Sequence, residues 1–247
     1  ICGAQMNTYN AMNLPTAARI DRVVAKRQFY DNGDLSAADK KAFDHMEKIY
    51  WRYALKTENT FIQPFADEER DYPEIEVMEV VLREEKQLKR LAEIIFRSIP
   101  YPMLLFFFLG DKVQLWLGKL RKNQADSNRM TLTATEQTEW LAEEDQFWEV
   151  LSLKRMPSTN FCALYEAWFD TVSRRHLTEV GISAQGLSGE AARETMNQLQ
   201  KIEQEITSLR SQMKRESQFN RKLEINTRLQ QLKREKTNII EQGSGET

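Results

Sequence analysis

The chain contains few of the residues from which common catalytic and metal sites are built. Its 247 residues include two cysteines, two histidines and nine glycines. Cys2 and Cys162 lie far apart and in no metal-binding spacing, which predicts a reducing, cytoplasmic environment without a disulfide framework. The glycines form no phosphate-binding loop, and His45 and His176 have no neighbouring nucleophile. We therefore expect no catalytic residues, no metal and no cofactor.

Long hydrophobic runs and an excess of one charge are also missing. The longest apolar run, Met103 to Leu109, is about a third of a membrane span and predicts a buried strand. The 35 basic and 37 acidic residues give a net charge of -2, so the whole chain has no field that attracts nucleic acid or a membrane. Residues 1–5 lack the basic and apolar regions of a signal peptide. Hydrophobic residues make up 41% of the chain, which is enough for a core.

The clearest pattern is a strand-helix-strand-strand unit within residues 75–120. Ile75 to Leu82 is an almost continuous apolar run, which is typical of a strand covered on both faces. Glu84 to Ser98 repeats its apolar residues at helical spacing. Residues 103–109 and 113–120 flank a Gly-Asp pair, which predicts a hairpin with a type II′-like turn. The sequence therefore predicts an α+β fold, in which helices cover a small sheet.

Three further helices are expected in the body of the protein. Ser36 and Asp39 resemble a capping box, and apolar residues recur at helical spacing from Ala37 to Leu55. A second helix is expected from Thr135, and a third from Thr159 to Val180. The body would then span residues 7–181, a hinge would span residues 182–189, and an arm would span residues 190–241.

The arm has the pattern of a coiled coil that is interrupted once. An apolar seam at alternating steps of three and four is formed by Leu199, Ile202, Ile206, Leu209 and Met213. The register fails near residues 216–219 and restarts in another phase at Ile225, Leu229, Leu232 and Ile239. Either one long helix contains a stutter, or the chain turns and returns as an antiparallel partner. The similar lengths of the two halves favour the antiparallel hairpin.

An acidic cluster around the first strand of the unit is the only candidate for catalysis. Asp71, Glu74, Glu76, Glu79 and Lys86 suggest a divergent metal-dependent nuclease, because such enzymes hold divalent ions with carboxylates beside a lysine. The spacing does not match, since Glu76 and Glu79 lie on opposite faces of an extended strand. The alternative interpretation is that they are solvated or edge-strand carboxylates.

The arm offers two kinds of binding surface. Its seam is expected to bind a protein partner, or a second copy of the chain, through Leu199, Ile202, Ile206, Leu209, Leu229 and Leu232. Between Arg210 and Lys236 nine residues are basic and three are acidic. A basic helix can follow a phosphate backbone or an acidic protein groove. The candidate nucleic-acid contacts are Arg215, Arg221, Lys222 and Arg228.

Four stretches of the chain resemble a bacterial family called domain of unknown function 4391. They are Tyr9–Pro15, Ile99–Pro102, Leu164–Trp168 and Gln218–Asn226. None is a catalytic motif. The resemblance implies an accessory protein encoded beside helicases and DNA methyltransferases in anti-phage, restriction-like gene clusters. We therefore expect a non-enzymatic subunit that docks on a helicase or a DNA methyltransferase, with the nuclease and a DNA-binding protein acting through the basic arm as alternatives.

Overall fold

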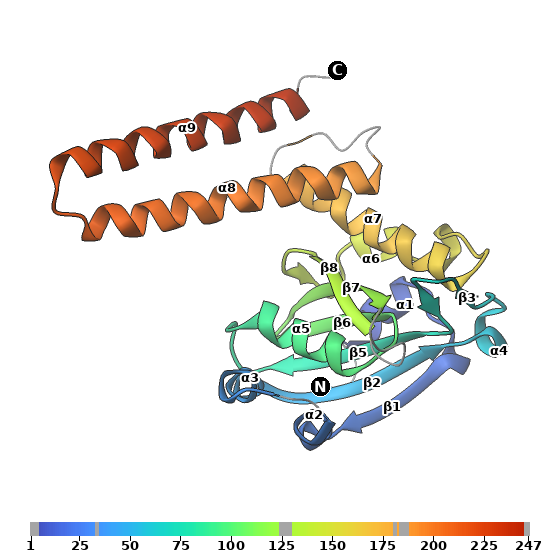
Figure 1. The fold of residues 1–247 in the computed structure, drawn as a ribbon. Helices are drawn as coiled ribbons and strands as arrows, with labels where there is room; N and C mark the ends of the chain where they lie inside the picture. Colours follow the sequence, from blue (N-terminus) through green and yellow to red (C-terminus); the bar gives the residue numbers. More distant parts are fainter. Residues whose placement is uncertain (1–4, 33–34, 124–129, 180–181, 183–187, 245–247) are drawn as a thin grey trace. The chain divides into compact units, whose positions relative to one another are not determined.

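The structure is a computed structural model that describes residues 5–32, 35–123, 130–179, 182 and 188–244 (Figure 1). The chain divides into two compact units, Ile1–Phe169 and Asp170–Thr247. The predicted hinge at residues 182–189 falls mainly outside the described residues. Among the described helices, none is long and apolar enough to cross a membrane.

The first unit is built on one open sheet, which has seven strands in the described part of the chain. The strands are β1 (Arg19–Val24), β2 (Met46–Leu55), β5 (Ile75–Leu82), β6 (Met103–Leu109), β7 (Lys112–Lys122), β8 (Met130–Gln137) and β9 (Leu141–Ala142). Their order is β1-β2-β5-β6-β7-β8, and β9 also pairs with β7. Strands β5 and β6 are parallel, and the other pairs are antiparallel. A separate small sheet pairs β3 (Phe65–Ala66) with β4 (Asp71–Tyr72).

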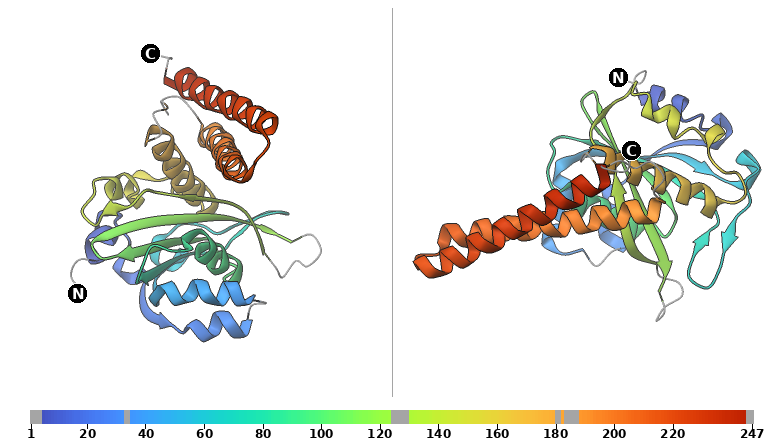
Figure 2. Two further views of the ribbon diagram at one scale, coloured as in Figure 1. Left: turned by 90° about the vertical axis from the view of Figure 1, so that its left-hand side faces the viewer. Right: turned by 90° about the horizontal axis from the view of Figure 1, so that it is seen from above.

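Helices cover both faces of this sheet (Figures 1 and 2). They are α1 (Gln5–Ala11), α2 (Lys26–Asn32), α3 (Ala37–Ala42), α5 (Leu88–Ser98), α6 (Phe147–Val150) and the first half of α7 (Phe161–Glu179). The single turn α4 (Thr57–Thr60) follows β2 and has no buried residue. Phe107 on β6 belongs to the core cluster with α5. The next ring along the strand, Phe106, points to the opposite face and packs against Tyr9 of α1 and Trp148 of α6, with centroids 5.3 and 6.0 Å away. Both faces of the sheet are therefore buried at its central strands β5 and β6.

The predicted strand-helix-strand-strand unit is confirmed as β5, α5, β6 and β7. Strand β5 is buried along almost its whole length, as expected for a strand covered on both faces. Helix α5 begins at Leu88, four residues later than predicted. At the hairpin between β6 and β7, Gly110 has φ of +65°, a backbone conformation that glycine adopts without steric cost. The predicted α+β fold class is also confirmed, because helices pack on a sheet of which this unit is the centre.

The predicted helix from Ala37 to Leu55 is wrong beyond its first turns. The capping box of Ser36 and Asp39 is present, but α3 ends at Ala42 and β2 begins at Met46. Strand β2 has two register shifts against β5, one at its start between Met46 and Lys48 and one in its middle between Trp51 and Tyr53. These irregularities break the alternation of a regular strand, so buried residues recur at steps of three and four. The burial pattern of this strand therefore imitates that of a helix.

The predicted helix from Thr135 is also wrong. Residues 130–137 form β8, which pairs with β7, and the helical part is the single turn α6. The segment alternates threonine with other residues at 131, 133 and 135, which suits a half-buried strand. The predicted helix from Thr159 to Val180 is confirmed as α7.

Helix α7 is fixed to the sheet through a tyrosine that lies over a glycine. The hydroxyl of Tyr165 accepts a hydrogen bond from the backbone N–H of Gly118 at 2.9 Å, and it lies 2.9 and 3.0 Å from the carbonyl oxygens of Met103 and Gly118. On the other side of Gly118, a Cβ atom would lie 2.8 Å from Cγ of Phe96 and 2.9 Å from Cδ1 of Leu132. The sheet therefore has no room for a side chain at this position.

We expect the substitution Gly118→Ala to lower the free energy of unfolding by about 1 to 3 kcal/mol, because the added methyl group overlaps the ring of Phe96. Urea unfolding measures the loss. The control is the double variant Gly118→Ala with Phe96→Ala, which removes Cγ and the ring of residue 96. The double variant should therefore lose less stability than the sum of the losses of the two single variants. Strictly additive losses would contradict the steric explanation.

The second unit contains two long helices, α8 (Gly189–Arg215) and α9 (Phe219–Ser244), which lie side by side as an antiparallel hairpin (Figures 1 and 2). The chain turns at residues 216–218, as the broken seam predicts. Ion pairs cross between the helices, from Arg228 to Glu205 at 2.9 Å and from Lys236 to Glu203. The stutter in one continuous helix is thereby excluded.

Candidate functional site

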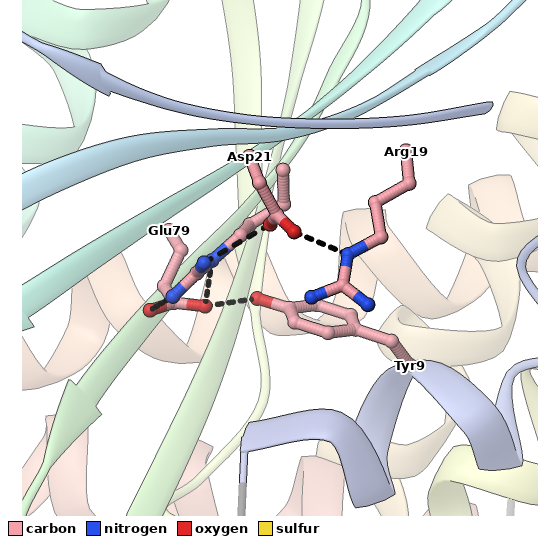
Figure 3. Close-up of polar contacts among 5 residues, drawn as sticks. Tyr9, Arg19, Asp21 and Glu79 are labelled. Atoms are coloured by element: carbon pink, nitrogen blue, oxygen red, sulfur yellow. Dashed lines mark hydrogen bonds and ion pairs between the residues drawn. The ribbon is translucent and has the colours of Figure 1, made fainter. Parts of the chain in front are cut away.

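A buried ion pair lies on the face of the sheet that α1 covers (Figure 3). The side chain of Glu79 on β5 has no exposed surface. Arg52 on the neighbouring strand β2 donates to both of its oxygens, with Nη2 2.7 Å from Oε1 and Nε 2.8 Å from Oε2. The hydroxyl of Tyr9 donates to Oε2 at 2.7 Å. Three donors therefore converge on one carboxylate.

The network reaches the edge of the sheet through Asp21 on β1. Nη1 of Arg52 lies 3.0 Å from Oδ1 of Asp21, and Arg19 forms an ion pair with the other oxygen of the same carboxylate. Asp21 has φ of +52° where the register of β1 shifts against β2. This left-handed conformation has a small cost for a residue other than glycine. The irregular strand thereby places Asp21 beside Arg52.

The geometry of this cluster suits stabilisation rather than catalysis. Both oxygens of Glu79 are occupied, and burial together with the adjacent Glu79 raises the pKa of Tyr9 well above its ordinary value of 10.0. Tyr9 is therefore a stable hydrogen-bond donor. The cluster joins α1, β1, β2 and β5, and both oxygens of Glu79 accept hydrogen bonds within it.

Glu76 lies on the opposite face of β5. It accepts a hydrogen bond from Nε1 of Trp51. Burial raises its pKa to about 8, against the opposing effect of the Trp51 hydrogen bond, and the neighbouring carboxyl of Glu74 raises it further. Glu74 pairs in turn with Lys56, with Nζ 3.2 Å from Oε2. Glu76 therefore holds a proton near neutral pH.

The structure does not bring the acidic residues of the nuclease hypothesis into one site. Glu76 and Glu79 are separated by the sheet, as their spacing predicts. The alternative interpretation, that they are solvated or edge-strand residues, is wrong, because both are buried on a central strand. Within the described residues, no group of three or more His, Cys, Asp or Glu is placed to hold a metal ion.

Sequence reasoning missed most of the buried network. Tyr9, Asp21 and Arg52 are distant in the sequence from Glu79, and Arg52 was placed in a helix that is in fact β2. It also missed Glu143, a buried residue whose Oε2 has no hydrogen-bond partner among the described residues. Burial raises the pKa of Glu143, and nearby acidic residues, Glu144 first, raise it further. No local pattern marks these residues, because the tertiary fold alone brings them together.

The seam residues predicted to bind a partner lie inside the hairpin. Ile202, Ile206, Leu229 and Leu232 are buried against one another between α8 and α9, and Leu209 packs beside them. Leu199 belongs to a second cluster, with Leu177 of α7. In this arrangement the seam holds the two helices together. A partner would therefore bind the outer faces of the hairpin, and binding through the seam stays a prediction that requires the hairpin to open.

The predicted nucleic-acid contacts are all exposed. Arg228 is paired with Glu205, and Arg221 has Nη1 3.9 Å from a carboxylate oxygen of Glu216. Within the part of the chain that the structure describes, Arg215 and Lys222 form no ion pair. The four residues therefore differ in how much free charge they present.

The end of the hairpin carries exposed apolar residues that sequence reasoning did not single out. We call residues 210–224, which contain the turn, the hairpin tip. Phe219 is 78% exposed and Leu223 is 56% exposed. The carboxylate of Glu216 accepts hydrogen bonds from the backbone N–H groups of Ser217 and Gln218, both at 2.8 Å. The turn that presents Phe219 is therefore held by local hydrogen bonds. The position of Phe219 and Leu223 outside the seam was the available signal.

Comparison with known proteins gives one match. The model of a family described as domain of unknown function (DUF4391) matches residues 12–235. No curated protein and no solved structure matches the chain.

Proposed function

The chain belongs to the family described as domain of unknown function (DUF4391), a description that names no activity, and from this premise we propose that the protein is a non-enzymatic assembly subunit. It binds a larger protein through its C-terminal hairpin. The single observation that carries this proposal is the construction of the hairpin. Helices α8 and α9 bury one narrow apolar seam between them, and most of their remaining surface is exposed.

A helical hairpin of this kind is a preformed binding element. Helices of 27 and 26 residues extend over about 40 Å each. Because the two helices already order each other, a partner would not need to order them on binding, which lowers the entropy cost of association. The second unit therefore has the properties of an arm for attachment.

The partner class follows from the resemblance described for the sequence. A helicase or a DNA methyltransferase of a cytoplasmic anti-phage, restriction-like assembly is the expected partner. The exposed Arg215 and Lys222 also support contact with DNA as a second function. Such contact would weaken steeply with salt, whereas an apolar protein contact would not.

The nuclease remains a rival hypothesis that has a direct test. The purified protein is incubated with DNA and magnesium or manganese, alone and with its partner. Cleavage that disappears in the variant Glu79→Gln, while the variant stays folded, would contradict the assembly proposal.

We expect deletion of residues 190–241 to abolish copurification with the partner. The partner is first identified by mass spectrometry of complexes isolated from the native host with the full-length protein. The truncated protein is then compared with the full-length protein in binding to the purified partner. Near-ultraviolet circular dichroism checks that the sheet with its buried tryptophans is intact. Binding that survives the deletion would refute attachment through the hairpin.

A further inference from the structure

The two apolar residues at the hairpin tip point away from the seam because of their helical phase. An α-helix turns by about 100° per residue, so Phe219 and Leu223 are about 40° apart on one face of α9. Leu232, which is buried in the seam, is nine residues beyond Leu223 and therefore lies about 180° from it. The outward direction of this pair is a property of the helix register, and not of a frayed end.

Two adjacent exposed apolar side chains are unusual on this surface. Single exposed hydrophobic residues are common and need no explanation. Among the described residues of α8 and α9, however, Phe219 and Leu223 are the large hydrophobic side chains that are exposed, and they are neighbours. The same outer face continues with polar residues such as Gln230 and Arg234. The apolar pair is therefore confined to the tip.

Positive charge is concentrated around the same pair. The hairpin tip contains two acidic residues, Glu216 and Glu224, and five basic residues, which are Arg210, Lys214, Arg215, Arg221 and Lys222. The rest of the hairpin, residues 189–209 and 225–244, is here called the shaft. Along the shaft, Arg228 and Lys236 are paired with Glu205 and Glu203. Positive charge is thus concentrated near the exposed ring of Phe219 and the methyl groups of Leu223, and the shaft is more nearly neutral.

We propose that the hairpin tip inserts Phe219 and Leu223 into an apolar pocket rimmed by carboxylates on the protein partner. This inference rests on the proposed assembly function and specifies its binding surface. Interaction hot spots are a few side chains, often aromatic residues or arginine, that fill desolvated pockets of the partner. Complementary charge on the partner speeds association and fixes orientation.

The apolar pair favours a protein over a nucleic acid as the occupant. A phosphate backbone would pair with Arg221 and Lys222 but would leave Phe219 and Leu223 in water. A protein pocket removes both side chains from water and pairs the same charges with carboxylates. Only a protein pocket would therefore bind both the apolar pair and the basic residues of the tip.

The test begins by placing the photocrosslinker benzoylphenylalanine in the full-length protein in its native host. It replaces Phe219 or, as a control on the same outer face, Gln230. Mass spectrometry identifies the linked peptide. We expect position 219, and not position 230, to link to a partner segment in which Asp and Glu flank apolar residues. Linkage of position 219 to DNA, RNA or a second copy of this chain would overturn the proposal, and so would the absence of any link.

The second stage measures affinity for the identified, purified partner by calorimetry. Phe219→Ser with Leu223→Ser, and separately Arg221→Glu with Lys222→Glu, should each weaken binding about tenfold or more. The matched shaft control, Lys233→Glu with Arg234→Glu, should change it less than about twofold. Lysine substitutions of the crosslinked partner's carboxylates should restore binding to the Arg221→Glu, Lys222→Glu protein.

These outcomes separate the inference from the function on which it rests. If deletion of residues 190–241 abolishes binding but both tip variants bind within about twofold of the wild type, the assembly function stands and the tip proposal is refuted. If the deletion leaves binding intact, both are refuted. Circular dichroism of each variant verifies the helical hairpin.

Discussion

Replacement of Glu79 by alanine is expected to lower the free energy of unfolding by about 3 to 5 kcal/mol. The substitution removes a carboxylate that accepts from Arg52 and Tyr9 and leaves Arg52, whose side chain is 15% exposed, without its buried partner. A buried charge without compensation is more costly than the loss of the ion pair itself. Urea unfolding followed by tryptophan fluorescence measures the change.

Three variants separate the charge effect from the loss of packing. Tyr9→Phe removes one hydrogen bond to a charged acceptor and should cost about 1.5 to 3 kcal/mol. Glu79→Gln keeps the shape of the side chain but removes the buried negative charge beside Arg52, which then keeps its ion pair with the more exposed Asp21. The double variant Arg52→Met with Glu79→Leu removes both charges, so it should be more stable than Glu79→Ala. A double variant that is less stable than Glu79→Ala would refute the ion-pair explanation.

Local patterns predicted the elements whose residues repeat regularly. The run from Ile75 to Leu82, the hairpin at Gly110 and helix α7 were all predicted, because each depends on a simple period or on a turn residue. Strand β2 was not predicted, since its register shifts change which residues are buried. Its pairing with β1 and β5 outweighs the helical spacing of its apolar residues.

For the candidate sites too, local patterns predicted some positions of single residues but not their surroundings. The opposite placement of Glu76 and Glu79 follows from the two-residue period of a strand, and it was predicted. Their burial was not predicted, because the partners of Glu79 come from α1 and β2. The turn of the hairpin was predicted from the broken seam, whereas the exposure of Phe219 required the phase of α9. Non-local packing therefore decides the environment of each charge.

The buried carboxyl of Glu76 makes stability depend on pH, and the sign follows from its pKa. The ordinary pKa of glutamate is 4.5, and burial raises that of Glu76 to about 8 in the folded chain. Between these values the unfolded chain releases a proton that the folded chain retains. The free energy of unfolding therefore falls as the pH rises from about 4.5 to about 8, and it is constant with respect to this group above that range.

We expect the variant Glu76→Gln to remove this dependence. The amide oxygen can still accept the hydrogen bond from Trp51, and the neutral side chain has no proton to release. Relative to the wild type, the variant should gain about 4 kcal/mol between pH 5 and pH 9. The measurement is urea unfolding of both proteins at intervals of pH.

The neighbouring Glu74 provides the control, because its carboxyl raises the pKa of Glu76 in addition to burial. In Glu74→Gln the decline in stability should end at a lower pH than in the wild type but should still occur, since burial of Glu76 is unchanged. Parallel curves for the wild type and Glu76→Gln would show that Glu76 keeps an ordinary pKa. The buried carboxyl would then have to be stabilised as an anion by Trp51 and Lys56, and the proton on Glu76 would be excluded.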